Sequence, residues 1–375
     1  MTTSESSKSS QVIGEVITEV VAEVRGKLGM ITLNRPKALN ALSLGMVRDL
    51  LATLLAWQKD PAVLGVAIRG SNKDGVFGAF CAGGDIRFLH GAGSNGNPQL
   101  EDFFTEEYAL NHLIHTLGKP YIAFMDGIVM GGGMGISQGG TLRIVTERTK
   151  MAMPETAIGL FPDVGGGYFL SRCPGSVGEW LALTGETIGA GDAVAFKLAD
   201  GCIPSDQQAD LWETLATTDF ANVEALNAVV CSRFVSMESK SAAYCAEIDA
   251  CFSLPTVTAI EQALLAGSDW AKAQAATLRK RSPLMLHVVL EQIRRARKMT
   301  LAEDLRMERD MVRHCFYLRP GQSETLEGIR ALAVDKDHSP RWNPASIEEV
   351  SDAQWQAFFA SPWPGHSHPL AMLKD

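Results

Sequence analysis

MGGGMGIS, residues 130–137, follows the short apolar segment YIAFMDG (121–127) and leads into a predicted helix. Two further Gly-rich segments, AGGD (82–85) and GGG (165–167), stand at comparable strand-to-helix turns. Glycine permits tight turns, and a helix start adds free N–H donors at the positive end of its dipole. Two such N–H groups aimed at one point would form an oxyanion hole. The competing interpretation is that these glycines serve only turn geometry and packing.

The segments around these turns alternate between strand and helix patterns. Branched residues at 15–34 predict a hairpin with its turn at Gly26–Gly29, and a helix over 42–58 follows, with Ser43 as N-cap. A buried strand is expected at 62–69. The later elements are a helix over 101–118 and short strands at 121–127, 141–146 and 150–155. Such β-β-α repeats indicate an α/β fold in which the units stack as a spiral, and not a flat doubly wound sheet.

The chain divides into three regions by pattern. Residues 1–14 are polar and expected to be mobile, without a secretory signal or a clear mitochondrial leader. Residues 15–204 form the predicted spiral core. Residues 205–375 lose the strand pattern and are predicted to be mainly helical, with a capping box beginning at Thr300.

Composition narrows the function classes. The formal net charge of −9 opposes nucleic-acid binding, which relies on basic patches, but a small phosphate-bearing ligand needs only a few local cations. Runs without charge are broken by glycine or proline, so no membrane span is predicted. The seven cysteines lack CxxC spacing and indicate reduced core residues. No metal-ligand spacing is present, and no metal is predicted.

One Gly-rich motif is misleading. Residues 91–96 (GAGSNG) match GxGxxG literally. A dinucleotide-binding turn must follow a strand and open a helix, whereas residues 88–90 have the pattern of a helix end and Asn97-Pro98 comes next. Residues 91–96 are therefore expected to form a mobile loop.

Four carboxylates are candidates for chemistry. Glu155 follows Pro154 at the end of a predicted apolar strand, and Asp163 lies in the apolar segment GLFPDVGGG. Burial among apolar groups prepares a carboxylate for acid–base or nucleophilic work. For Glu107, on the face of the predicted helix 101–118 that carries Phe103 and Phe104, a functional and a structural role are both open. Asp85 is expected to serve as a helix-start acid.

Several segments together resemble the crotonase superfamily in order and spacing. They are LNRPKALNAL (33–42), FCAGGDI (80–86), the turn at 131–135 and MPETAIGLFPDVGGGYFL (153–170). Within the superfamily, FFTEEYALN (103–111) and EGIRALAVDKDHSPRWNP (327–344) resemble the branch that hydrolyses 3-hydroxyisobutyryl-CoA. The resemblance covers residues 16–345, and MPETAIGLFPDVGGG is its most specific part.

The resemblance implies a spiral β-β-α core, a helical C-terminal region and binding of acyl-CoA thioesters. It implies that the backbone N–H groups of Gly84 and Gly132 hold the thioester oxygen and that Glu155 is the catalytic carboxylate. Glu155 would act as nucleophile, through a mixed anhydride, or as general base toward water. Glu107 and Asp163 would contact the acyl group, one holding the substrate hydroxyl and the other positioning water.

Further substrate contacts are implied by the same matches. Lys37, Ala38 and Leu39 would line the adenine side of CoA, and Ala82, Asp85 and Ile86 would border the first Gly turn. No cofactor is implied, because CoA is part of the substrate. The implied pathway is valine degradation in the mitochondrial matrix, with a cytoplasmic location as the alternative. The expected partner is the acyl-CoA alone, and a homo-oligomer is compatible with the resemblance.

Gly135 separates hydrolysis from hydration within the superfamily. Enoyl-CoA hydratases carry two catalytic glutamates; the second matches Glu155, and the first would stand where this chain has Gly135. Hydration needs two acid–base groups, whereas thioester hydrolysis needs a polarised carbonyl, one carboxylate and water. The sequence therefore predicts hydrolysis of a 3-hydroxyacyl-CoA. The rivals are a hydratase or isomerase and a non-catalytic hydrolase-like subunit of a mitochondrial ribosome, which the net charge opposes.

Overall fold

The computed structural model describes residues 18–375, and the predicted mobile segment 1–14 lies outside this range. The strands, in chain order, are β1 (Val20–Arg25), β2 (Leu28–Leu33), β3 (Gly65–Asn72), β4 (Gly75–Val76), β5 (Tyr121–Met125), β6 (Ile128–Met130), β7 (Leu142–Val145), β8 (Lys150–Ala152) and β9 (Gly201–Cys202). The structure contains every one of these predicted strands, with bounds shifted by a few residues. They are the hairpin, the buried strand predicted at 62–69 and the short strands predicted at 121–127, 141–146 and 150–155.

The helices fall into two groups along the chain. Up to residue 195 they are η1 (Pro36–Ala38), α1 (Leu44–Lys59), α2 (Ile86–Asn95), α3 (Gln99–His115), α4 (Gly132–Gln138), η2 (Glu155–Ile158), α5 (Gly166–Leu170), α6 (Val177–Thr184) and α7 (Ala190–Ala195). After β9 they are η3 (Ser205–Gln207), α8 (Gln208–Thr217), α9 (Val223–Cys231), η4 (Ala242–Tyr244), α10 (Cys245–Phe252), α11 (Val257–Ala266), α12 (Asp269–Leu278), α13 (Pro283–Ala296), α14 (Leu301–Tyr317), α15 (Glu324–Ile329), η5 (Arg330–Val334), η6 (Ile347–Glu349), α16 (Asp352–Gln356), η7 (Ala357–Phe359) and η8 (Gly365–Ser367). The predicted N-cap at Ser43 and the capping box at Thr300 are both formed.

The main sheet has the order β1-β2-β3-β5-β7-β9, with β4 paired to β3. Only the β1–β2 and β3–β4 pairs are antiparallel. Alternate side chains of β5 enter different cores, because successive residues of a strand point to opposite faces. Ala123 and Met125 face the core that includes α1 and α3, whereas Ile122 and Phe124 meet Trp212 and Leu215 of α8. The sheet is thus covered on both faces.

A second, smaller sheet positions the site. Strands β6 and β8 pair in parallel, and Cys81 extends the row through a parallel bridge to Val129. Because the three segments run the same way, their carboxyl ends meet at one edge. A glycine turn or an acid follows each end within three residues: Gly84 after Cys81, Gly132 after β6 and Glu155 after β8.

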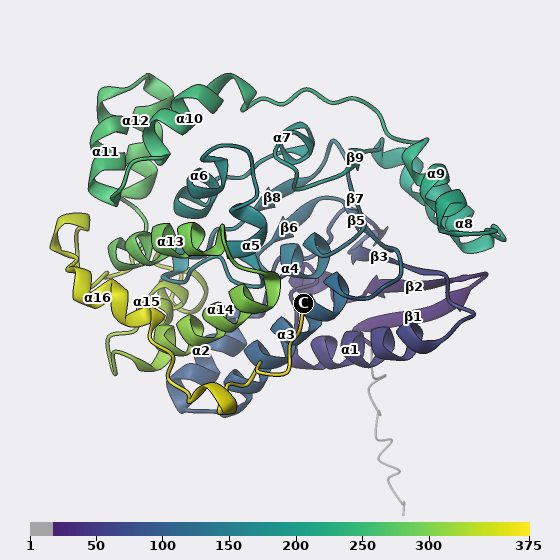
Figure 1. Cartoon of the computed structure of the whole chain (residues 1–375), viewed down its shortest axis with the longest axis horizontal. Helices are drawn as coiled ribbons and strands as arrows, with labels where there is room; N and C mark the ends of the chain where they lie inside the picture. The colour runs from purple at the N-terminus through teal and green to yellow at the C-terminus, as the bar shows by residue number, and fades with distance from the viewer. Residues whose placement is uncertain (1–17) are drawn as a thin grey trace, which may run out of the picture.

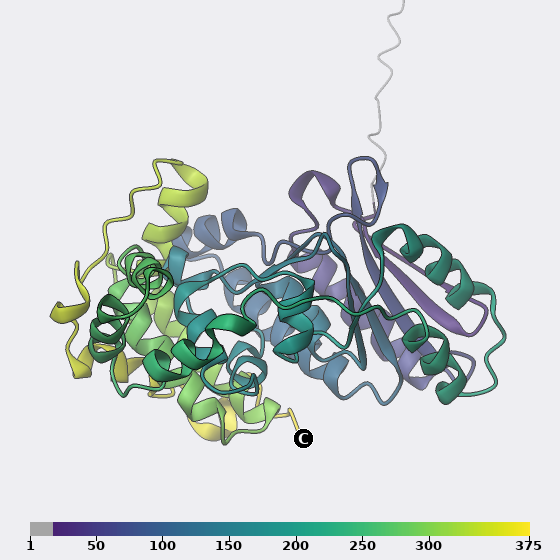
Figure 2. The ribbon, with the colours of Figure 1, turned by 90° about the horizontal axis from the view of Figure 1, so that it is seen from above.

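The helices after β9 lie in two places. α8 and α9 pack on the main sheet, while α10–α16 gather on the other side of the molecule, reached by a long connection after α9 (Figures 1 and 2). The prediction of a mainly helical segment is confirmed, since the only extended pairing after Ser205 in the described part of the chain is a bridge from Val235 to Cys202. The division into units at residue 204 stays a prediction. Among residues 18–375, no helix combines the length and apolar character that a membrane span requires.

Three local predictions are wrong. Residues 91–96 form no loop: α2 continues through Asn95 and ends at Gly96, whose left-handed conformation closes the helix. Glu155 does not end a strand, because β8 stops at Ala152 and Glu155 opens the 3₁₀ helix η2. The glycines at 165–167 begin α5 without a preceding strand.

Helix α14 holds the third glycine turn in place. Glu308 accepts hydrogen bonds from the N–H groups of Gly165 (2.7 Å) and Gly167 (2.9 Å), and Asp304 accepts one from Tyr168 (2.8 Å). These carboxylates satisfy the free N–H groups at the start of α5. The third glycine turn is therefore a structural joint, and its N–H groups are not available to a ligand.

Replacing Glu308 by Gln should lower the free energy of unfolding by about 1–3 kcal/mol, because the amide NH₂ leaves one buried N–H of α5 without an acceptor. Glu303→Gln, on the same helix, is the matched control: Glu303 completes the exposed capping box, a position that accepts Gln equally well. Urea unfolding of both variants measures the difference. Equal stabilities of the two variants would contradict the assigned role of Glu308.

Candidate active site

The three segment ends of the small sheet open into one cavity of about 250 Å³. Its lining includes both glycine turns, the carboxylates of Glu107, Glu155 and Asp163, and apolar side chains from several elements and loops. The lining residues other than these three acids are Ala82, Gly83, Gly84, Ile86, Leu89, Phe103, Phe104, Met130, Gly131, Gly132, Pro154, Ala157, Ile158, Leu160, Val164 and Leu332. A mostly apolar cavity with a few convergent polar groups is typical of a small-molecule site.

The two glycine turns touch each other at the cavity wall. A methyl group added to Gly132 would lie 3.3 Å from the backbone nitrogen of Gly84. Among the hydrogen bonds of residues 18–375, neither the Gly84 N–H nor the Gly132 N–H donates to a protein acceptor. Gly83 and Gly131 precede them with φ of +104° and +49°, values that favour glycine. The turns thus present two neighbouring free donors to the cavity.

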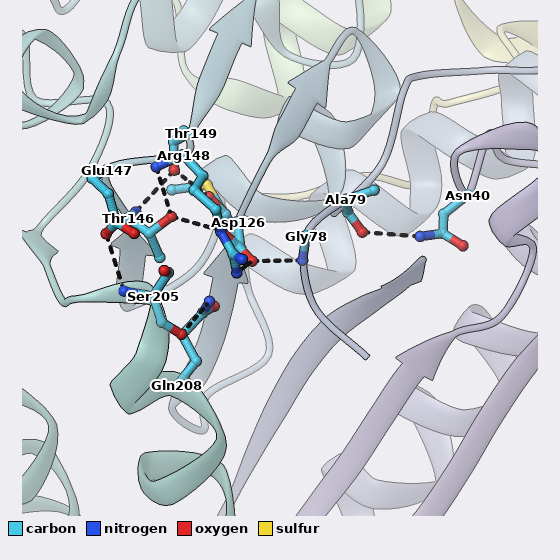
Figure 3. Close-up of polar contacts among 11 residues, drawn as sticks. Asn40, Gly78, Ala79, Asp126, Thr146, Glu147, Arg148, Thr149, Ser205 and Gln208 are labelled. Atoms are coloured by element: carbon cyan, nitrogen blue, oxygen red, sulfur yellow. Dashed lines mark hydrogen bonds and ion pairs between the residues drawn. The ribbon is translucent and has the colours of Figure 1, made fainter. Parts of the chain in front are cut away.

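A buried polar network fixes the first of these turns from behind (Figure 3). The fully buried Asn40 side chain donates to the carbonyls of Ser71 (2.8 Å), Ala79 (3.0 Å) and Phe80 (3.1 Å). On the other side of the same segment, Asp126 accepts from the Gly78 N–H at 2.5 Å and is itself held by Thr146 and Arg148. The segment that leads into Cys81 and Gly84 is therefore anchored on both sides.

Glu155 and Glu107 reach the second turn from two different elements. A methyl group added to Gly131 would lie 2.8 Å from Oε1 of Glu155, and one added to Gly132 would lie 2.6 Å from Oε1 of Glu107. Each glutamate has one buried carboxylate oxygen without a hydrogen-bond partner in the described part of the chain. Both carboxylates are therefore free to interact with a bound molecule next to the two N–H donors.

Asp163 is held by a residue that the sequence did not single out. The hydroxyl of Tyr108 donates to Oδ2 of Asp163 at 2.8 Å, and both side chains are buried. Burial raises the pKa of Asp163 to about 6, while the Tyr108 hydrogen bond acts in the opposite direction by stabilising the ionised form. Asp163 is thus the carboxylate of the three that is most readily ionised at neutral pH.

The matching family model is that of enoyl-CoA hydratase/isomerase, over residues 28–359. The chain belongs to this family. Rat 3-hydroxyisobutyryl-CoA hydrolase, mitochondrial, is 40% identical over 92% of this chain and 89% of its own length. The human protein of the same name is 39% identical over 92% of this chain and 89% of its own length. The family resemblance inferred from the sequence is confirmed.

Solved structures of the family agree with the fold. A carnitinyl-CoA dehydratase from Mycobacterium thermoresistibile superimposes with a TM-score of 0.84 at 37% identity, covering 92% of this chain and 97% of that one. An enoyl-CoA hydratase from Rhodobacter sphaeroides superimposes with a TM-score of 0.83 at 37% identity, covering 92% of this chain and 98% of that one. The predicted crotonase-like fold is confirmed. The names of the relatives and of these structures cover both hydrolysis and hydration, so the reaction must be argued from the site.

The structure brings together most of the residues predicted for this family site. Gly84, Gly132, Glu107, Glu155, Asp163, Ala82 and Ile86 all line the cavity. Asp85 does not line it: its carboxylate caps α2 through the Phe88 N–H at 3.2 Å and pairs with Arg35 at 2.7 Å, as expected of a helix-start acid.

Lys37, Ala38 and Leu39 also stand outside the cavity lining, on η1 and its C-cap. They remain next to the first glycine turn, because the Ala82 N–H donates to the Leu39 carbonyl at 3.0 Å. Lys37 and Leu39 are exposed. Their role toward the adenine side of CoA therefore stays a prediction.

Like charges and burial act together on the two glutamates of this family site. Burial raises the pKa of Glu107 well above its usual value, and the neighbouring carboxylates of Asp163 and Glu155 raise it further. Burial, and then the neighbouring Asp163, also raise the pKa of Glu155 well above its usual value. Three carboxylates in one apolar cavity cannot all ionise without strong repulsion. The cavity therefore retains protons that isolated carboxylates would lose.

Glu107→Gln should stabilise the fold more at pH 8 than at pH 5. Because the folded-state pKa of Glu107 lies above the unfolded value, the stability linked to its protonated form is present at low pH and is lost as pH rises through the folded pKa. Glutamine does not titrate, so it escapes this loss. At pH 8 Glu107→Gln should therefore have a free energy of unfolding more than ~1 kcal/mol above that of the wild type, the equivalent of about one pKa unit. Thermal unfolding at both pH values measures it.

The control for this experiment is Glu106→Gln on the same helix. Glu106 is solvent-facing and pairs with Arg48 at 2.7 Å, so its replacement should give no gain at pH 8. An equal effect of Glu107→Gln at pH 5 and pH 8 would show that carboxylate repulsion does not burden this cavity.

Proposed function

We propose that the chain hydrolyses the thioester of 3-hydroxyisobutyryl-CoA, and of the related 3-hydroxypropionyl-CoA, to the free acid and CoA. The observation that carries the proposal is the placement of two free N–H donors, from Gly84 and Gly132, beside the unpartnered carboxylate of Glu155. The names of the rat and human relatives supply the substrate, and the valine pathway follows from it.

In this proposal the thioester oxygen accepts hydrogen bonds from both glycine N–H groups. Charge builds on that oxygen as the carbonyl carbon becomes tetrahedral, and each fixed donor in such a hole stabilises the transition state by roughly 2.7–4 kcal/mol. Asn40 and Asp126 hold the segment that leads into the first turn, and the second turn is the start of α4, so both donors are held by the fold before a substrate binds.

Glu155 would attack the carbonyl carbon or activate the water that does. In the first route a Glu155 oxygen forms the new C–O bond as the C–S bond breaks, CoA leaves as thiolate, and water then cleaves the mixed anhydride. In the second route Glu155 takes a proton from water as the water oxygen attacks. Both routes need Glu155 ionised. The pKa shift caused by burial and Asp163 makes it a stronger base once ionised.

Asp163 and Glu107 would recognise the substrate's own hydroxyl and position water. An ionised Asp163, fixed by Tyr108, is a strong acceptor for a 3-hydroxyl group. Glu107 would then position water on the other side of the acyl chain. All groups used belong to the chain or to the substrate, so the proposal includes no cofactor. The mitochondrial names of the relatives support the mitochondrial matrix as the site of action.

Hydration of an enoyl-CoA is the second candidate, since the two solved structures described above bear hydratase and dehydratase names. Gly135 is a weaker argument against it than the sequence indicated, because Glu107 brings another glutamate into the cavity from α3. Glu107, however, comes from a different element than the residue that Gly135 replaces. Hydrolysis therefore stays the proposed reaction, and an assay of both activities distinguishes it from hydration.

The purified protein should release CoA thiol from 3-hydroxyisobutyryl-CoA and 3-hydroxypropionyl-CoA, and Glu155→Gln should abolish the release. Hydration of crotonyl-CoA, followed by loss of absorbance of the conjugated thioester, should be negligible beside it. A folded protein that frees no thiol from either substrate would refute the proposal. Crotonyl-CoA hydration as fast as thiol release would assign the chain to the hydratase reaction.

A further inference from the structure

A second cavity of about 180 Å³ lies directly behind the proposed active site. Val164 lines both cavities, so the two cavities adjoin at this residue. The lining of the second cavity combines apolar residues with Asn111, His115, Arg143, Arg172 and Lys197, and it contains no carboxylate. None of the roles proposed above uses it.

Helix α3 contributes polar residues to the lining of both cavities. Glu107, Asn111 and His115 are spaced by four residues, so they lie one above the other on the same side of the helix, about 6 Å apart per step. Glu107 lines the active-site cavity, whereas Asn111 and His115 line the second one. Glu107 and Asn111 are buried on a helix that also buries Phe103, Phe104 and Leu110, so their polar atoms need hydrogen-bond partners.

Asn111 is the critical member of this row. It is 3% exposed, and neither its amide nitrogen nor its amide oxygen has a hydrogen-bond partner within residues 18–375. A buried amide with no partner is costly, and nearly all buried polar groups are satisfied by protein or water. The amide offers both donors and an acceptor, the set that bridges water molecules on its two sides. Oε1 of Glu107, one turn away, is equally unpartnered.

Gly135 and Val164 shape the partition around Asn111. A methyl group on Gly135 would lie 2.6 Å from Cβ of Val164 and 3.0 Å from the amide nitrogen of Asn111. Any side chain at 135 would therefore displace both. Val164 adopts a φ of +58°, rare for a β-branched residue, in the segment that Glu308 anchors through Gly165. Val164 and the amide of Asn111 therefore lie together where the two cavities adjoin.

The proposed hydrolysis creates a need for such a passage. Each turnover consumes one water: its oxygen forms a new C–O bond, one of its protons ends on the CoA thiolate, and the other leaves to solvent. In the proposed complex the CoA chain would occupy the entrance of the cavity while the acyl group is bound, so a second path would let water reach the acyl group. On the basis of the proposed function, we propose that the second cavity is a rear water inlet and that Asn111 passes water across the partition to Glu107.

Asn111→Leu tests this inlet, because leucine keeps the size of the side chain and removes both polar atoms. Thiol release from 3-hydroxyisobutyryl-CoA should show kcat reduced about tenfold, the effect of one lost hydrogen bond in the limiting step, with KM unchanged. The melting temperature should not fall, since no protein hydrogen bond is lost. Asn111→Ser, which restores a group able to bind water, should recover most of kcat.

Asn227→Leu is the matched control, because Asn227 also has a buried amide oxygen without a partner but lies on α9 at the main sheet. Its kcat should equal that of the wild type. An Asn111→Leu variant with kcat within about twofold of the wild type overturns the inlet, as does a loss of kcat that Asn111→Ser does not relieve. Failure of the wild type to release thiol is a different result, and it refutes the proposed hydrolysis itself.

Discussion

The parallel pairing of three short segments is the constraint on which the site depends. Cys81, β6 and β8 run side by side in one direction, so whatever follows their carboxyl ends must meet at one edge. The chain places a glycine turn after the first two and a glutamate after the third. If one segment were reversed, its turn would move to the opposite edge. The pairing therefore brings together residues that are separated by more than seventy positions, from Gly84 to Glu155.

The surroundings of a buried acid decide what it does, and two groups of buried acids in this fold illustrate the difference. Asp304 and Glu308 of α14 accept hydrogen bonds from three N–H groups at the start of α5, which makes that junction structural. Glu107 and Glu155 face a cavity and keep unpartnered oxygens. Charged carboxylates in such surroundings are destabilising unless paired, so the protein maintains this cavity at a cost in stability. That cost is typical of a site kept for function.

Much of the fold could be predicted from periodicity and from turn chemistry. The hairpin, the helix after Ser43 and the helical segment after residue 205 follow from local patterns that the tertiary structure does not override. Residues 91–96 were misjudged because glycines in the last turns of a helix look like a loop when the packing of α2 is unknown. The GGG turn at 165–167 was predicted as a candidate ligand site because its N–H groups have no evident acceptor nearby in the sequence. The acceptor is Glu308, which lies 141 positions away from Gly167.

The candidate site was predicted in its main members but not in its supports. The resemblance placed Gly84, Gly132, Glu107, Glu155 and Asp163, and all five line one cavity. Tyr108 was missed although it lies in FFTEEYALN, because nothing local shows that its hydroxyl meets an acid 55 positions away. Asn111 has the one signal that sequence could have offered, its spacing of four from Glu107.

The measurement that tests the account most directly is a crystal structure with an uncleavable ketone analogue of 3-hydroxyisobutyryl-CoA, in which CH₂ replaces the thioester sulfur. The ketone oxygen stands for the thioester oxygen. The ketone oxygen should accept hydrogen bonds from the N–H groups of both Gly84 and Gly132, with a carboxylate oxygen of Glu155 facing the carbonyl carbon. A ketone oxygen directed away from these two N–H groups, or a carbonyl carbon out of reach of Glu155, would contradict it.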